Sequence, residues 1–248
     1  MLQAAQLGIG YQAGSPVFSG ISFNALPGDM VALLGVNGIG KSTLLRTLSG
    51  LLPKLGGSLG INGQDVQSLP IDKRAHLISV VLTERVFIDN ITVYDFIALG
   101  RAPYTGMMGG LGNEDVTAIE QVITAMHMWK LRTRLFNRLS DGEKQKTLIA
   151  RALCQQTPVM ILDEPTAFLD FRNKKEILEV LHGIAKDFKK VIVFSTHDIA
   201  AALDYCNKFW IMTEEKQFRE INKADNYRST VEEILYREEI NRSEGLNS

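Results

Sequence analysis

The sequence has few cysteines, almost no net charge and no hydrophobic run long enough to cross a membrane. Its 248 residues include two cysteines, Cys154 and Cys206, and 27 basic residues against 28 acidic ones. The cysteines lack metal-ligand spacing and lie in apolar or helical surroundings, which favours buried free thiols in a reducing compartment over a metal site or a disulfide. The formal charge of -1 excludes bulk electrostatic attraction to nucleic acid or to an anionic membrane.

Segments that target a chain to a membrane are also lacking. No stretch approaches the roughly 18 apolar residues that a spanning helix needs. The opening MLQAAQLGIG has no charged segment followed by a long apolar run. We therefore expect a chain that is neither secreted nor membrane-spanning by itself. Its 45% hydrophobic and 22% charged residues suit a full core, in one large domain or two small ones.

What the sequence does contain is a series of apolar runs of strand length, separated by helical stretches. Several runs are rich in Val and Ile without polar alternation, which indicates strands covered on both faces, as in a parallel sheet. Helices between such strands predict an α/β fold. The runs are MVALLG (30–35), LISVVL (77–82), VMILD (159–163) and KVIVFST (190–196).

The strand signals stop over about 90–156, where the pattern becomes helical. ITVYDFIALGR begins with a T-x-x-D capping box at Thr92 and Asp95, a second helical stretch follows a predicted Asn113 cap, and SDGEKQKTLIARALCQQ is a third. This pattern predicts a helical insertion between sheet strands. Beyond 213 the chain becomes polar, and one more capped helix is expected from about Thr230.

A phosphate-binding loop follows the first apolar run. GVNGIGKST fits G-x-x-x-x-G-K-[ST], in which Gly35, Gly38 and Gly40 let successive amides point at phosphate oxygens. Lys41 is expected to reach the β and γ phosphates, and Ser42 to bind Mg²⁺. A preceding strand and a following helix favour this interpretation over a Gly-rich turn with an incidental lysine.

Two later strands end in polar residues that suit the same site. Asp163 ends the VMILD run, where its carboxylate can hold Mg²⁺, and Glu164 can polarise an attacking water. His197 follows KVIVFST, where a γ phosphate would lie. An acid at a turn is the plainer interpretation of Asp163 alone, but the upstream loop strengthens the functional one. Structural or surface roles are expected for His76, His127 and His182.

The stretch LSDGEKQ resembles a second anion site. Ser140 can cap a helix while Glu143 reaches back as a capping box. The hydroxyl and the Gly142 amide then lie at the positive end of a helix, but the lysine and the metal ligands that hydrolysis requires are lacking. The alternatives are a well-made helix start and half of a phosphate site.

Together these motifs resemble those of the ATP-binding cassette (ABC) family, in particular a separate ATP-binding subunit of a transporter. GVNGIGKST is similar to the Walker A loop of that family, LSDGEKQ to its LSGGQ signature, VMILDE to its Walker B strand, AFLD to its D-loop and STHD to its switch histidine. The resemblance extends in the family's order from Tyr11 to Asp198. The combination is specific, although each motif except the first can occur by chance.

The resemblance implies an α/β fold with a P-loop NTPase (RecA-like) core. Its sheet is expected to be mostly parallel, with an antiparallel N-terminal β part and an inserted helical subdomain. The implied division is one ATPase domain over 1–225, with a nucleotide-binding core in 1–87 and 157–225, a helical subdomain in 88–156, and a C-terminal helix and tail over 226–248.

The resemblance also implies ligands and partners. In this family two subunits pack head to tail, and the signature of one covers the γ phosphate held by the other, so we expect a homodimer that binds ATP and Mg²⁺. Permease subunits in the membrane and a substrate-binding protein are the implied partners, with no nucleic acid, at the cytoplasmic face of the inner membrane. ITVYDFIALGRAPYTG is similar to the matching segment in importers of iron-siderophore, haem and cobalamin.

The resemblance also implies roles for individual residues. Tyr11 is expected to stack on adenine, with a core or surface tyrosine as the alternative. Asp170 is expected at the dimer seam, with a turn carboxylate as the alternative. The catalytic residues are Lys41, Glu164 and His197, and the metal ligands are Ser42, Asp163 and Thr83. The ATP-binding residues are Tyr11, Gly35, Asn37, Gly38, Gly40, Lys41, Ser42, Thr43, Ser140, Gly142 and Glu143.

Two positions depart from the family pattern. Thr83, followed by Glu84, occupies the position where the family usually has a glutamine, and either side chain can act as a metal ligand. A second acid beside the catalytic one can also repel it. We therefore expect retained ATP hydrolysis with altered coupling to the permease. Asp141 replaces a small residue of the signature, where an acid suits the helix dipole but lies near an anionic ligand.

Other functions fit parts of the sequence. A soluble non-transport ABC ATPase, such as an iron-sulfur assembly scaffold, is compatible with the chain length. A chromosome-maintenance ATPase is excluded, because the segment between Walker A and signature has no sustained heptads. A phosphoryl-transfer kinase would leave the signature unexplained.

Overall fold

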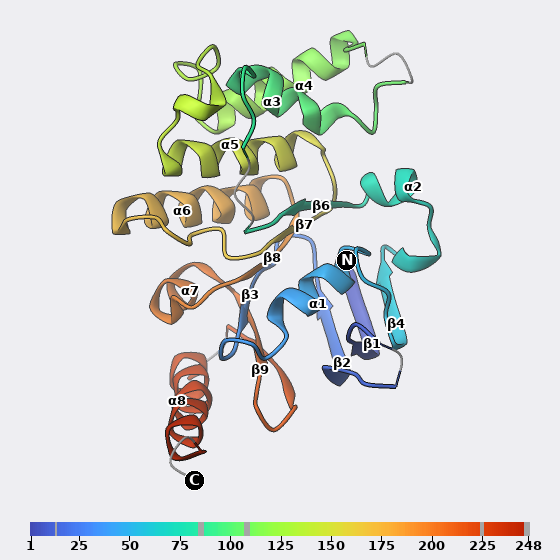
Figure 1. The fold of residues 1–248 in the computed structure, drawn as a ribbon, viewed down its shortest axis with the longest axis vertical. Helices are drawn as coiled ribbons and strands as arrows, with labels where there is room; N and C mark the ends of the chain where they lie inside the picture. The colour runs from blue at the N-terminus through green and yellow to red at the C-terminus, as the bar shows by residue number, and fades with distance from the viewer. Residues whose placement is uncertain (13, 84–86, 107–109, 224–225, 246–248) are drawn as a thin grey trace.

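Two β-sheets form the centre of the computed structural model, which describes residues 1–12, 14–83, 87–106, 110–223 and 226–245 (Figure 1). The smaller sheet is antiparallel in the order β2-β1-β4-β5. Its strands are β1 (Leu2–Ile9), β2 (Phe18–Ala25), β4 (Gly56–Ile61) and β5 (Gln64–Asp65). The expected antiparallel N-terminal part is therefore confirmed.

The larger sheet has six strands in the order β10-β9-β3-β8-β7-β6. All neighbours pair in parallel except β10, which runs antiparallel to β9. The strands are β3 (Met30–Leu34), β6 (Ile78–Val81), β7 (Val159–Leu162), β8 (Val191–Ser195), β9 (Lys208–Met212) and β10 (Phe218–Asn222). The four apolar runs are thus β3, β6, β7 and β8, as predicted.

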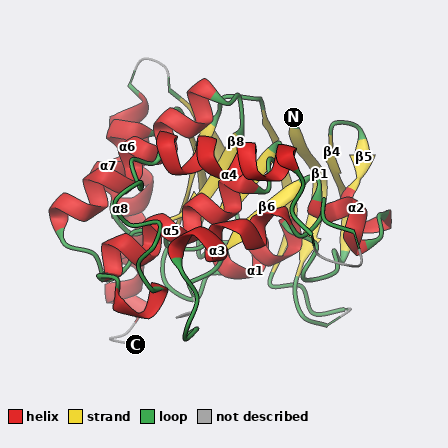
Figure 2. Ribbon diagram, turned by 90° about the horizontal axis from the view of Figure 1, so that it is seen from above, coloured by secondary structure: helices red, strands yellow, loops and turns green. Residues whose placement is uncertain are grey.

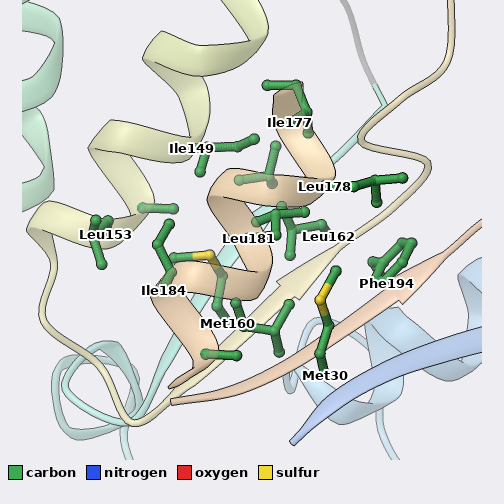
Figure 3. Close-up of a cluster of buried hydrophobic side chains, with 14 of the residues drawn as sticks. Met30, Ile149, Leu153, Met160, Leu162, Ile177, Leu178, Leu181, Ile184 and Phe194 are labelled. Carbon is green, nitrogen blue, oxygen red and sulfur yellow. The ribbon is translucent and has the colours of Figure 1, made fainter. Parts of the chain in front are cut away.

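Both faces of the parallel strands are buried, which explains their lack of polar alternation. In β3, Met30 and Leu34 join a cluster with the helices, whereas Val31 joins a cluster toward the smaller sheet. Figure 3 shows part of the first cluster, where strand side chains meet those of α5 (Asp141–Cys154) and α6 (Phe171–Asp187). These two cores fix the strand ends that carry the candidate site.

Helices cover the sheets, and a group of them fills the segment between β6 and β7. This group, α3, α4 and α5, lies beyond α6 from the sheet in Figure 1 and covers strands in the view of Figure 2. The predicted helical insertion is therefore present, and its limits as a domain stay a prediction. The remaining helices are α1 (Lys41–Leu48), α2 (Ile71–Ala75), α3 (Val93–Ala98), α4 (Asn113–Ala125), α7 (Ile199–Tyr205) and α8 (Tyr227–Gly245), with short 3₁₀ turns at Val66–Ser68, Leu99–Arg101 and Phe136–Arg138.

Helix caps in this group differ in part from the prediction. The Thr92 hydroxyl accepts from the Asp95 N–H at 3.1 Å, as predicted, but it also donates to the Asp95 carboxylate at 2.5 Å. The predicted Asn113 cap is wrong, because Gly112 is the N-cap residue of α4. The Asp115 carboxylate accepts from the Gly112 N–H at 3.0 Å, so an acid inside the helix serves the end that Asn113 was expected to serve.

The C-terminal region also departs from the prediction. Helix α8 begins at Tyr227 rather than near Thr230, and the Tyr227 hydroxyl donates to the Leu203 carbonyl at 3.1 Å. Strand β10 was not predicted, because its sequence FREIN has only two apolar residues, which do not alternate with polar ones, and its burial is only partial. The start of α8 depends on a contact with a residue distant in the sequence, and β10 depends on pairing at the edge of the sheet. The local sequence contains neither signal.

Both cysteines are buried and free, as expected. Burial raises the pKa of the Cys154 thiol to about 11 and also raises the pKa of the Cys206 thiol. In the part of the chain that the structure describes, no helix has the length and apolar character needed to cross a bilayer.

Candidate nucleotide-binding and catalytic site

The predicted catalytic residues gather at one edge of the larger sheet. Strands β3, β8 and β7 are neighbours and run in parallel, so the residues that follow each of them meet at the same edge. The glycine-rich loop follows β3, Asp163 and Glu164 follow β7, and His197 comes shortly after β8. Ligands of open α/β sheets bind at such edges.

The glycine-rich loop adopts a backbone that needs glycine. Gly35, Gly38 and Gly40 have φ values of 146°, 81° and 120°. A Cβ on Gly35 would lie 2.6 Å from the Met212 carbonyl oxygen, and one on Gly40 would lie 2.8 Å from Val17 Cγ1. The loop is therefore fixed both by conformation and by close packing. It leads directly into α1, whose N-cap is Gly40.

Lys41 holds the loop from within. Its Nζ donates to the Gly35 carbonyl at 2.7 Å and to the Val36 carbonyl at 3.1 Å, and the residue is only 7% exposed. Burial lowers the pKa of Lys41, while the charges of Glu164 and Asp163 act in the opposite direction. The ammonium group is thus placed between the loop and the two acids, where it can move from carbonyl oxygens to phosphate oxygens.

Two hydroxyl groups hold the turn after β7. The Ser195 hydroxyl donates to Asp163 Oδ1 at 2.7 Å and accepts from the Glu164 N–H at 2.9 Å. On the other side, the Thr83 hydroxyl donates to the Asp163 carbonyl at 2.9 Å. The sequence reasoning missed Ser195. Its signal was its position two residues before the predicted histidine, at the end of a buried strand.

Glu164 and His197 contact each other directly. Glu164 Oε1 and His197 Nε2 form a hydrogen bond, and both side chains are partly exposed. With Nε2 as the donor, the imidazole orients the carboxylate at the sheet edge. The structure therefore brings the three residues predicted as catalytic into one neighbourhood, because the charge of Glu164 acts on Lys41 and its carboxylate bonds to His197.

The start of α5 has the predicted capping box. The Glu143 N–H donates to the Ser140 hydroxyl at 3.3 Å, and the Ser140 N–H donates to Glu143 Oε2 at 2.8 Å. This N–H bond, aided by the Arg134 ion pair at 2.9 Å, holds the pKa of Glu143 below its ordinary value. A Cβ on Gly142 would lie 2.9 Å from Asn173 side-chain atoms, so α5 packs closely on α6 there.

The two predicted anion sites lie apart within one chain. In Figure 1 the helical group that contains α5 is separated from α1 along the long axis of the molecule, with α6 and the sheet between them. The start of α5 therefore does not join the loop that precedes α1 in the same copy, although Asp141, Lys144 and Gln145 of α5 border one pocket with Asp163 and Glu164.

The other predicted residues lie near the loop, except Asp170. The Thr43 hydroxyl donates to the Tyr11 hydroxyl at 3.4 Å, and Tyr11 is 63% exposed. Asn37 and Ser42 are exposed at the loop and at the second position of α1. Asp170 is the N-cap of α6, which agrees with its alternative interpretation as a turn carboxylate. Tyr11 is therefore placed beside the first turn of α1, with its ring open to a ligand.

The donor set fits Mg²⁺. Ser42 offers a hydroxyl and Asp163 a carboxylate, and Mg²⁺ prefers oxygen ligands of this kind beside phosphate oxygens. Asp163 Oδ1 is engaged by the neighbouring serine, which leaves Oδ2 for a metal ion. The Thr83 hydroxyl proton is directed at a carbonyl, so only its lone pairs remain available. Glu84, the other predicted candidate, lies outside the described residues.

Family comparison identifies this arrangement. The family model described as ABC transporter matches residues 18–167, and the chain belongs to this family. It is an ATP-binding subunit of an ABC transporter and hydrolyses ATP for transport.

Individual relatives cover most of the chain. A cobalamin import ATP-binding protein of Halobacterium salinarum is 31% identical over 82% of this chain, which spans only 50% of that protein. An iron(3+)-hydroxamate import ATP-binding protein of Bacillus subtilis is 30% identical over 80% of this chain and 73% of its own length. The structure of an inward-facing transporter described as metal-chelate type has a TM-score of 0.81 and 27% identity, over 95% of this chain and 88% of that chain.

Proposed function

We propose that the chain powers an importer of iron-siderophore, haem or cobalamin, through two ATP sites that are each shared between two copies of the chain. The observation that carries the proposal is the placement of the two anion sites. One combines the glycine-rich loop, Lys41 and the acids at the sheet edge, whereas the start of α5 is separated from α1 and its loop.

The residues at the sheet edge have separate roles in this proposal. The amides of the glycine-rich loop and Lys41 bind the β and γ phosphates of ATP. Ser42 and Asp163 hold Mg²⁺, which offsets the charge on the phosphate oxygens. Glu164 accepts a proton from the water that attacks the γ phosphorus, while the bond from that phosphorus to the oxygen of ADP breaks. His197 orients Glu164 through the Nε2 hydrogen bond and lies beside the γ phosphate.

The start of α5 completes the site of the other copy. Ser140 and the Gly142 amide contact the γ phosphate that the partner's loop holds, and two-fold symmetry then produces two equal sites. ATP joins the two copies and hydrolysis releases them. Tyr11 stacks on the adenine ring, for which its open position beside α1 is suited.

The partners follow from this cycle. Permease subunits bind the dimer at the cytoplasmic face of the inner membrane. They convert the opening and closing of the dimer into transport. A substrate-binding protein delivers the cargo, and nucleic acid has no part. Relatives named for import of cobalamin and of iron(3+)-hydroxamate, together with the metal-chelate type structure, support this range of cargo.

A specific pair of measurements tests the proposal. Glu164→Gln is expected to lower the ATPase rate roughly 10²- to 10³-fold while ATP binding is kept, because it removes the proton acceptor. The matched control is Glu179→Gln, on the exposed part of α6, and its rate is expected to stay within about twofold of the unmodified protein. An equal fall in both variants would contradict the catalytic assignment.

Copurification tests the transport assignment. When the protein is isolated from its native membranes after mild crosslinking, integral membrane proteins are expected to accompany it. Recovery of soluble iron-sulfur proteins alone would contradict the importer and would favour the non-transport scaffold.

A further inference from the structure

A buried serine joins the two acids of the candidate site; it is the first residue of STHD, a motif in which only the histidine was assigned a role. Ser195 is the last residue of β8 and is 0% exposed. Its hydroxyl donates to Asp163 Oδ1 at 2.7 Å and accepts from the Glu164 N–H at 2.9 Å. One oxygen atom therefore contacts the side chain of the expected metal ligand and the backbone of the expected catalytic base.

Both contacts constrain geometry that the chemistry needs. Donation to Oδ1 sets the rotation of the Asp163 carboxylate and leaves Oδ2 directed away from the serine. Glu164 has a φ of 47°, a left-handed conformation that residues other than glycine rarely adopt. The bond from its N–H to Ser195 holds the backbone there, and this conformation sets the direction in which the Glu164 side chain leaves the turn.

We infer that Ser195 is a positioning residue for both acids: it orients Asp163 toward Mg²⁺ and fixes the backbone from which Glu164 reaches the attacking water. This inference rests on the proposed roles of those two acids. Groups that hydrogen-bond a metal-binding carboxylate hold it in place, and their removal lowers metal affinity or activity roughly 10- to 100-fold.

The same sheet contains a matched control. Ser79 lies in β6, is 1% exposed, and accepts a hydrogen bond from the Thr157 hydroxyl at 2.9 Å. Thr157 precedes β7, so this bond lies toward the amino-terminal end of the strands, away from Asp163 and Glu164. Loss of the Ser79 hydroxyl removes a buried serine bond between the same kinds of elements without touching the site.

The experiment measures the response to Mg²⁺ in Ser195→Ala, Ser195→Cys, Ser195→Thr and Ser79→Ala. The first readout is the affinity for a non-hydrolysable ATP analogue, with Mg²⁺ and with EDTA. The second is the Mg²⁺ concentration that gives half-maximal ATPase rate. Melting temperature is recorded for each variant. Ser195→Cys nearly keeps the side-chain volume, but its thiol is a weak hydrogen-bond donor. This variant therefore tests the inference if the alanine variant does not fold.

For Ser195→Ala and Ser195→Cys we expect affinity in EDTA within about twofold of the unmodified protein and a half-maximal Mg²⁺ concentration raised roughly 10- to 100-fold. Ser195→Thr, which keeps the hydroxyl, is expected to restore the Mg²⁺ response, and Ser79→Ala to leave it unchanged. The inference is overturned if the alanine and cysteine variants keep the normal response, or if Ser79→Ala shifts it equally.

Asp163→Asn separates the two levels of failure. It is expected to lose most of the Mg²⁺ response. If it keeps a normal response, the proposed metal site itself is wrong. If it loses the response while the Ser195 variants keep theirs, only the positioning role of Ser195 is wrong.

Discussion

The starts of α1 and α5 are both expected to bind phosphate, but they are built differently. Helix α1 begins after Gly40, which has no side chain to cap it, and its first turn carries no acid. Helix α5 begins after Ser140 in a complete capping box, and its first turn contains Asp141 and Glu143. The first-turn amides of a helix need a partner, which is a capping side chain, water or a ligand.

The difference supports the proposal that one start acts alone and that the other needs a second copy of the chain. The open amides before α1 and the nearby Lys41 provide an anion site in a single copy of the chain. The start of α5 already has a side-chain partner and two acidic groups that oppose an anion. In the proposed shared site, a second copy supplies the lysine and Mg²⁺ that offset those charges and make phosphate favourable there.

The largest effect is expected from removing the cation at the α1 site. Lys41→Met keeps most of the buried volume but abolishes the charge, and the ATPase rate should fall roughly 10²- to 10³-fold, because an ammonium aimed at developing phosphate charge is lost. Lys54→Met is the control, since Lys54 forms a partly exposed ion pair with Asp65 at 2.7 Å. Its rate should stay within about twofold. A Lys41→Met protein that keeps more than about a tenth of the rate would contradict the account.

Replacing glycines of the loop before α1 by alanine tests how this loop is held, through the free energy of unfolding. Gly35→Ala places a Cβ 2.6 Å from a carbonyl oxygen at a φ of 146°, so its free energy of unfolding should fall by about 3 kcal/mol or more. Gly38→Ala has open space around its Cβ and a φ of 81°, and should lose only about 1 kcal/mol. Urea unfolding compares them. Equal losses would show that close packing does not fix this loop.

The smallest effect is expected from the cap of α5 and depends on pH. The pKa of Glu143 is lowered below 4.5, mainly by the Ser140 N–H bond. The stabilisation from this carboxylate is therefore fully present at pH values above its pKa in the unfolded chain. It is lost as the pH falls through its pKa in the folded protein. Glu143→Gln should lower the free energy of unfolding by a few tenths of a kcal/mol near pH 7. This difference between the variant and the unmodified protein should become smaller toward pH 4. A gap that stays constant in urea unfolding across this range would contradict the assignment.

The sequence predicted the parts of the fold and site that depend on strong local patterns. The buried runs of β3, β6, β7 and β8 lack polar alternation, and the glycines of the loop allow a backbone that few other residues adopt. The capping box of Ser140 and Glu143 was also predictable, because both partners lie within one turn.

The remaining features depend on contacts that local patterns do not contain. Gly112 rather than Asn113 caps α4, because Asp115 reaches back to its N–H. Ser195 acts on residues of another strand, and only the sheet order brings them together. The separation of the α5 start from the loop before α1 likewise required the arrangement of the helices.

The most direct test of the shared ATP site is sedimentation of Glu164→Gln with and without Mg²⁺ and ATP. The substitution should spare nucleotide binding while stalling hydrolysis, so the account predicts a shift from monomer to dimer on addition of Mg²⁺ and ATP. The shift should disappear when Ser140→Arg is added, because the larger side chain blocks the start of α5. A dimer that forms equally well with Ser140→Arg would contradict the account.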